Sequence, residues 1–143
     1  MKITEPRTDR EFEQYYEMRW KILRAPWKQA RGSEQAPDDA ISTHLMVLDD
    51  DNTLIGVGRL HFNSIREAQI RFMAIDLSEQ RKGIGTRLLQ ALEAKAREHG
   101  AASITLDARE TAMGFYRKQG YRPLGPGHTL FNCIAHVKMT KTL

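Results

Sequence analysis

The 143-residue chain is 41% hydrophobic and 28% charged, with a formal net charge of +4 and a pI near 9.4. This composition is typical of a globular protein, and the length predicts one domain over residues 1–143. There is no run of about 18 apolar residues, no apolar segment behind Met1 and no cysteine besides Cys133. We therefore expect no membrane span, no secretion signal, no internal disulfide and a cytoplasmic location.

The N-terminal half predicts a helix and four strands. Thr8 and Glu11 have the spacing of a capping box, and the helix that they begin is expected to reach about Arg24 and to stop at Pro26. The polar residues 32–39 predict a loop or a short helix. Apolar runs on either side of an Asp-rich turn predict a meander. The expected strands are Met1–Thr4, His44–Leu48, Leu54–Phe62 and Gln69–Asp76.

The C-terminal half predicts two helices and two strands. Apolar residues recur at helical spacing from Ile84 to Ala96, and Gly100 is placed to end this helix. The remaining expected elements are a strand at Ser103–Ala108, a short helix at Thr111–Gln119 and a strand at Asn132–Thr140. Strands and helices therefore mix along the chain, which predicts an α/β fold.

The turn between the third strand of the meander and the long helix predicts a phosphate site. A strand that turns through Gly83 and Gly85 into a helix leaves backbone N–H groups free at the positive end of the helix dipole. The glycines also remove the Cβ atoms that would keep a pyrophosphate away from the backbone. Neither a P-loop signature nor the three glycines of a Rossmann fingerprint are present. We therefore expect a phosphorylated ligand of another kind.

Two segments resemble signatures of the GNAT superfamily of N-acetyltransferases. Gln80, Gly83 and Gly85 fill the defined positions of its acyl-CoA signature, Q/R-x-x-G-x-G/A. Residues 115–121, Phe-Tyr-Arg-Lys-Gln-Gly-Tyr, look like its F-Y-x-K-x-G-F/Y segment and follow an apolar strand, as in the family. The two resemblances cover roughly residues 67–123.

The resemblance implies a GNAT fold, with a mixed, mostly antiparallel sheet that splays between its fourth and fifth strands and is flanked by helices. It also implies acetyl-CoA as co-substrate, with no metal. The acyl carbonyl group of the donor would lie against the backbone of the strand that precedes Gly83. Backbone N–H groups of that strand would stabilise the oxyanion that forms there. The expected cofactor-binding residues are Met73, Ala74, Ile75, Gln80, Arg81, Lys82, Gly83, Ile84, Gly85, Thr86 and Arg109.

Tyr116 occupies the position of the family's tyrosine, which protonates the departing thiolate. A tyrosine, with an ordinary pKa of about 10, can donate a proton when it is held at the sulfur; packing alone is the alternative role. The chain departs from the family seven residues earlier, where Arg109 replaces an asparagine that contacts pantetheine. That contact is either missing or made by Arg109.

The acceptor side is expected at the first helix and the following loop. Arg19 lies on an otherwise apolar stripe, so it either snorkels out of the core edge or binds an acceptor carboxylate. Arg24 and Trp27 lie near the C-terminal end of that helix and are expected to form part of the acceptor pocket. His136 is expected there too, because it belongs to a tail that resembles the substrate-side hairpin of small family members. For the general base the sequence leaves several candidates open, namely His44, His61, Glu34, Glu110 and His136.

The implied activity is transfer of an acetyl group from acetyl-CoA to a primary amine by direct attack in a ternary complex. A protein amine as acceptor and an acyl-CoA sensor without turnover are the alternatives. Nucleic-acid binding is not expected, because the basic residues are scattered and no recognition signature is present. The positive charge would instead steer an anionic ligand. The family also implies a possible homodimer.

Overall fold

A computed structural model describes residues 1–143. Its α-helices are α1 (Asp9–Leu23), α2 (Ile84–Glu98) and α3 (Met113–Lys118). Its strands are β1 (Lys2–Thr4), β2 (Thr43–Leu48), β3 (Leu54–Phe62), β4 (Glu67–Ile75), β5 (Ser103–Arg109), β6 (Arg122–Leu130) and β7 (Ile134–Thr142). Short 3-10 turns occupy Ala25–Trp27, Asp39–Ile41, Leu77–Glu79 and Glu110–Ala112.

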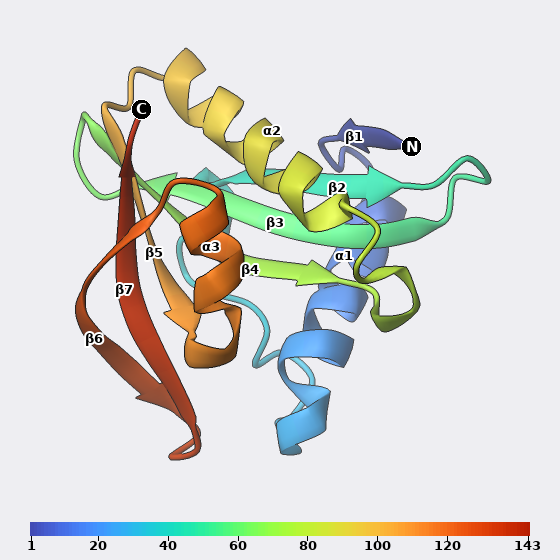
Figure 1. Cartoon of the computed structure of the whole chain (residues 1–143). Coiled ribbons are helices and arrows are strands. Elements are labelled where there is room, and N and C mark those ends of the chain that lie inside the picture. Colours follow the sequence, from blue (N-terminus) through green and yellow to red (C-terminus); the bar gives the residue numbers. More distant parts are fainter.

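The strands form one sheet in the order β1-β2-β3-β4-β5-β7-β6 (Figure 1). All neighbours are antiparallel except β4 and β5, which are parallel. The parallel pairing joins only Glu67–Ile70 to Ser103–Leu106, although both strands continue beyond it. The predicted splay between the fourth and fifth strands is confirmed. The edge of β4 that faces β5 therefore has no strand partner from Arg71 onward.

A β-bulge interrupts β4 beside this opening. Val57 pairs with Ala74 and Arg59 pairs with Arg71, so Phe72 and Met73 together oppose Gly58. Phe72 has a φ of 55°, a left-handed conformation that bulky residues rarely adopt. Bulges re-aim side chains and are frequent beside functional sites.

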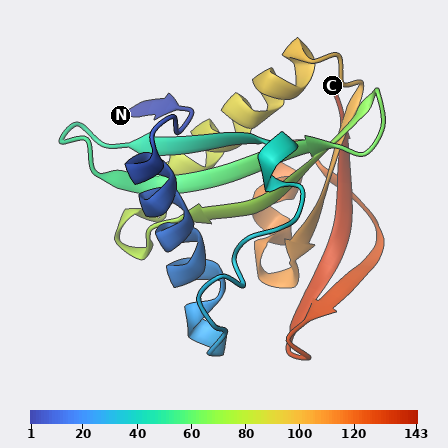
Figure 2. The same ribbon diagram turned by 180° about the vertical axis from the view of Figure 1, so that it is seen from behind.

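Helices cover both faces of the sheet: α2 and α3 lie on one face and α1 on the other (Figures 1 and 2). The apolar stripe of α2, with Leu88 and Leu92, packs with alternate residues of β2 such as Leu45. Met46, the next residue of β2, points to the opposite face and packs with Tyr15 of α1. None of the helices is long and apolar enough to cross a membrane.

Most expected elements are present, and the capping box is formed as predicted. The Thr8 hydroxyl accepts from the Glu11 amide, and the Glu11 carboxylate accepts from the Thr8 amide. Strand β6 was not among the strands expected from the sequence, and it contains Pro123 and Pro126. Prolines are tolerated there because β6 is an edge strand. The last strand begins at Ile134 and not Asn132, since Asn132 lies in the left-handed turn of the β6–β7 hairpin.

Candidate functional site

A cleft of about 820 Å³ opens where β4 and β5 separate. The end of α1, the start of α2, helix α3 and the β6–β7 hairpin complete its walls. The predicted site residues that line it are Arg24, Met73, Ala74, Ile75, Gln80, Arg81, Gly83, Gly85, Thr86, Arg109, Tyr116 and His136. Segments from both halves of the chain therefore meet at one cavity.

One end of the cleft is the glycine turn at the start of α2. Gly83 is the N-cap residue, with a φ of 79° and no side-chain cap. The first hydrogen bond of the helix runs from the Arg87 amide to the Gly83 carbonyl oxygen. The three preceding amides, of residues 84–86, therefore have no intrahelical acceptor. This arrangement suits a phosphate group.

Two predicted cofactor-binding residues do not line this cavity. The side chain of Ile84 is 6% exposed and belongs to the main core, so only its backbone amide can face a ligand. The ammonium of Lys82 lies 3.0 Å from a carboxylate oxygen of Glu79. Arg81, in contrast, lines the cleft and makes no side-chain ion pair.

The middle of the cleft is the unpaired edge of β4. Met73, Ala74 and Ile75 line it directly after the bulge. The Gln80 side chain donates to the Ile75 carbonyl oxygen over 3.4 Å, which ties the glycine turn to the end of β4. Backbone groups of β4 are therefore accessible along one side of the cleft.

Tyr116 faces β4 across the gap. Its hydroxyl donates to the sulfur of Met73 over 3.9 Å, a weak interaction that a better acceptor can replace. Burial raises the pKa of Tyr116 to about 12, against the opposing effect of the nearby Arg109 charge. The hydroxyl therefore keeps its proton throughout the physiological pH range, and it is a weaker acid than an ordinary tyrosine.

The far end of the cleft is aromatic and basic. The Arg109 guanidinium carbon lies 4.6 Å from the centre of the Trp27 ring, and Trp27 stacks on Phe131 of the β6–β7 turn at 6.2 Å. Trp27 supports Arg109 but does not itself line the cleft. Arg24 lines it and lies 5.4 Å from the Phe131 ring.

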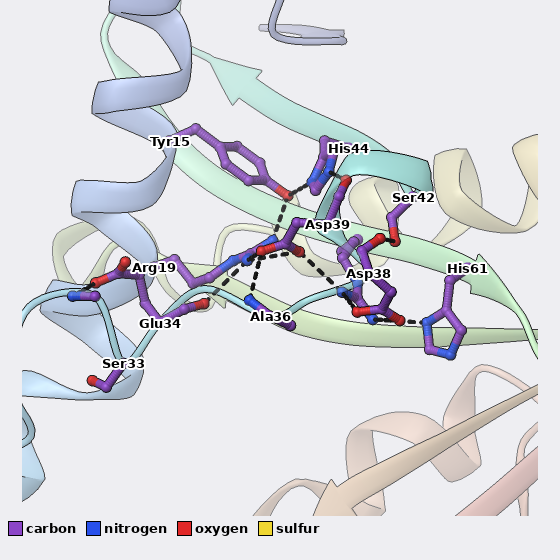
Figure 3. A network of polar contacts seen from close by, with 12 residues as sticks. Tyr15, Arg19, Ser33, Glu34, Ala36, Asp38, Asp39, Ser42, His44 and His61 are labelled. Atoms are coloured by element: carbon purple, nitrogen blue, oxygen red, sulfur yellow. Dashed lines mark hydrogen bonds and ion pairs between the residues drawn. The ribbon is translucent and has the colours of Figure 1, made fainter.

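Arg19 does not line the cleft. Its side chain belongs to the polar network of Figure 3 and does not snorkel. The side chain is fully buried. Its guanidinium donates to both carboxylate oxygens of Asp39, at 3.2 and 3.1 Å, and to the Glu34 carbonyl oxygen. Arg19 therefore binds the carboxylate of Asp39 in the same protein and not that of an acceptor. The snorkelling interpretation is wrong, and this guanidinium is not available to an acceptor.

The same network holds three of the base candidates (Figure 3). His44 is bonded through Nδ1 to Tyr15 and through Nε2 to the Asp39 carbonyl oxygen. His61 lies 2.9 Å from the Arg59 guanidinium, and Glu34 accepts from the Gly32 amide. None of the three lines the cleft. The contacts of the network instead fix the loop before β2 to the sheet. Glu110 does not line the cleft either.

His136 is the base candidate that lines the cleft. Its Nδ1 atom lies 3.0 Å from the Ile134 carbonyl oxygen, so Nδ1 carries the proton in the neutral ring and Nε2 has a free lone pair. Burial, and then repulsion by His128, lower the pKa of His136. The imidazole is therefore neutral at physiological pH and able to accept a proton.

Three further residues that were not predicted from the sequence also line the cleft, namely Arg71, Asp107 and His128. Phe72 was noted only as part of its strand. Asp107 and His128 are linked by a 3.4 Å contact between Oδ2 and Nδ1. Asp107 is a polar residue near the end of an apolar strand, which was an available signal. Arg71 and Phe72 carried no such signal, because the bulge that directs them is a feature of strand pairing.

Comparisons with known proteins agree with this geometry. The family model for the acetyltransferase (GNAT) domain matches residues 21–143. The chain is 31% identical over 100 residues to the uncharacterised N-acetyltransferase YjcF of Bacillus subtilis, covering 70% of each chain. It is 28% identical over 137 residues to the uncharacterised N-acetyltransferase YitI of the same species, covering 92% of this chain and 91% of the relative.

Solved structures share the fold at low sequence identity. A GNAT-family acetyltransferase from Staphylococcus aureus Mu50 has a TM-score of 0.80 at 18% identity and covers 99% of this chain and 98% of its own. An aminoglycoside 6′-N-acetyltransferase complexed with coenzyme A also has a TM-score of 0.80 at 18% identity, with coverages of 99% and 97%. From its matching family model and its relatives, the chain belongs to the GNAT family of acetyltransferases.

Proposed function

We propose that residues 1–143 form one catalytic domain that transfers the acetyl group of acetyl-CoA to a primary amine in a ternary complex. The observation that carries the proposal is the continuity of the cleft. It runs from the free amides at the start of α2, along the unpaired edge of β4, to the Tyr116 hydroxyl. A fold neighbour that is a complex with coenzyme A supports acyl-CoA as the donor.

The glycine turn would hold the pyrophosphate of the donor. The amides of residues 84–86 would donate to it at the positive end of the α2 dipole, and Arg81 would add a positive charge. A Cβ built on Gly85 would lie 3.5 Å from the Phe115 ring. Because that is ordinary contact distance, the glycine is not required by packing within the protein. Its absent side chain would instead leave room for the ligand.

The reaction would then take place between β4 and Tyr116. The amine nitrogen attacks the thioester carbonyl carbon, and backbone N–H groups after the bulge stabilise the resulting oxyanion. The carbon–sulfur bond breaks, and the Tyr116 hydroxyl gives its proton to the departing thiolate. Nε2 of His136 takes the proton that the amine loses. Both proton carriers line the same cleft.

Ligand binding and turnover test the proposal separately. At a hundredfold excess over the dissociation constant, a ligand adds about 2.7 kcal/mol of stability, a shift of several degrees in Tm. We expect acetyl-CoA and CoA to produce this shift and ATP to have no effect. Release of free thiol from acetyl-CoA on addition of a primary amine would support transfer. If acetyl-CoA stabilises the protein but no amine causes release of free thiol from it, the protein would instead be an acyl-CoA sensor.

A further inference from the structure

Three arginines at the end of the cleft have no acidic partner. Arg24 follows α1, Arg71 lies on β4 before the bulge, and Arg109 ends β5; all three line the cleft. No carboxylate oxygen lies within 4.0 Å of their side-chain nitrogens, although Arg19 and Arg59 nearby are both paired. Arg71 and Arg109 also make no side-chain hydrogen bond, so their donors are free to bind a ligand.

Aromatic rings hold the three guanidinium groups in place without neutralising them. The guanidinium carbons of Arg24 and Arg71 lie 5.6 and 4.5 Å from the centre of the Phe72 ring. Arg109 lies 4.6 Å from the Trp27 ring. Contact with a ring face positions a guanidinium but leaves its charge and its in-plane N–H donors available. The left-handed bulge is what directs Phe72 into this position.

The carboxylates of the cleft are engaged elsewhere. Glu79 is paired with Lys82 at 3.0 Å, and Asp107 is in contact with His128 at 3.4 Å. Outside the cleft, Asp38 and Asp39 bind the buried Arg59 and Arg19. Positive charge thus accumulates at this end. Burial lowers the pKa of Arg24, and repulsion by Arg71, Arg19 and Arg109 lowers it further.

We infer that the acceptor is an acidic amine, whose carboxylate or phosphate group is bound by Arg24, Arg71 and Arg109. The inference rests on the proposed function, since it names the acceptor class for that same cleft. Planar guanidinium groups bind carboxylate and phosphate oxygens in pairs of parallel, charge-assisted hydrogen bonds. The acidic group would anchor the acceptor beyond Tyr116, with its amine directed toward β4. Amines that carry several positive charges would be repelled.

Matched pairs of amines test the inference. Acetylation is measured with glutamate against glutamate diamide, which has no carboxylate, and with phosphoethanolamine against ethanolamine for a phosphate. We expect the acidic member of at least one pair to have a kcat/KM at least tenfold higher. The pair that shows this preference identifies the anionic group. At saturating acetyl-CoA, two variants, Arg71→Gln and Arg109→Gln, should each raise KM for the acidic amine about tenfold or more. Arg71→Gln, which replaces a residue not expected to bind the donor, should barely change KM for the neutral amine.

Arg66→Gln is the control variant, because Arg66 is exposed in the turn before β4 and its side chain makes no hydrogen bond or ion pair. It should leave the preference unchanged. Equal use of both members of every pair, or a preference that survives both test variants, would overturn the inference while leaving the proposed acetyl transfer intact.

A binding assay separates the two hypotheses if no amine is acetylated. Calorimetry with glutamate and phosphoethanolamine is carried out on protein saturated with CoA, so that the donor phosphates already occupy their own site. Binding that is lost in Arg71→Gln would support the anion site and count against the acetyl transfer. No binding and no turnover with any acidic amine would overturn the inference.

Discussion

The hydroxyl oxygen of Tyr116 lies 3.9 Å from the sulfur of Met73, across the gap where β4 and β5 separate. Met73 lies on β4 and Tyr116 on α3, the helix that follows β5. Because β4 and β5 pair only over Glu67–Ile70 and Ser103–Leu106, the splay creates the space between the two side chains. If a thioester bound along β4, its sulfur could replace the Met73 sulfur as the hydrogen-bond acceptor of the Tyr116 hydroxyl. In the proposed mechanism, Tyr116 is therefore the group that would protonate the departing thiolate.

Replacing Tyr116 by phenylalanine should lower kcat at least tenfold while changing the affinity for acetyl-CoA little. The ring contacts with Phe115 and Tyr121 remain, so only the proton donor is lost. Single-turnover thiol release and calorimetry measure the two quantities. Tyr121→Phe is the matched control, because the Tyr121 hydroxyl bonds Glu93 and lies outside the cleft. Unchanged turnover in Tyr116→Phe would remove this residue from the mechanism.

Substitution of Gly85 by valine should weaken binding of CoA at least tenfold. The branched side chain would fill the space beside the free amides of α2 without a severe clash in the protein, since the nearest atoms to a Cβ are those of Phe115 at 3.5 Å. The Tm without ligand should therefore fall little, while the stabilisation by CoA should be lost. Gly114→Val controls for a glycine replaced in open space at another helix. Full stabilisation of Gly85→Val by CoA would contradict the proposed position of the pyrophosphate.

The glycine-turn end of the cleft was predictable because its signals are local. The turn through Gly83 and the helix after it follow from a few consecutive residues, and the position of Tyr116 follows from a second short segment. The basic end of the cleft, and the buried network outside it, depend on contacts between distant residues. In that network Arg19 and Asp39 are 20 residues apart, and no local pattern shows that they pair. The bulge at Phe72 likewise depends on the register between β3 and β4.

Replacing His128 by asparagine should move the acidic limb of the pH profile of kcat/KM to higher pH. Burial first, and then repulsion by His128, hold the pKa of His136 below its ordinary value. Without the stacked ring, 4.6 Å away, His136 gains solvent and loses the repulsion. Its pKa rises, so it becomes protonated, and inactive as a base, at higher pH. In His136→Gln the limb should disappear. A profile unaltered in both variants would exclude His136 as the base.

Replacing Asp39 by asparagine should destabilise the protein by about 3–5 kcal/mol, because the buried Arg19 would lose its only carboxylate partner and the buried Arg59 would lose one of two. The control is Asp38→Asn. The Asp38 side chain is 36% exposed and pairs with Arg59 alone, so its loss should cost distinctly less. Chemical denaturation at pH 7 measures both. Equal losses would show that the network depends on Arg59 and not on the carboxylate shared with Arg19.

Acidification should destabilise the protein by protonating the same carboxylate, that of Asp39. Burial opposes ionisation of Asp39, but hydrogen bonds from the Ala36 amide and Arg59, together with the Arg19 charge, outweigh it and lower the pKa. A carboxyl group with a lowered pKa stabilises the folded state above its unfolded value of about 3.9, and that contribution is lost as pH falls through the folded value. Between pH 5 and pH 3 the Tm should therefore fall more steeply in the wild type than in Asp39→Asn. The difference arises because the variant has already lost the group that titrates; parallel slopes would mean that acid unfolding is controlled by other carboxylates.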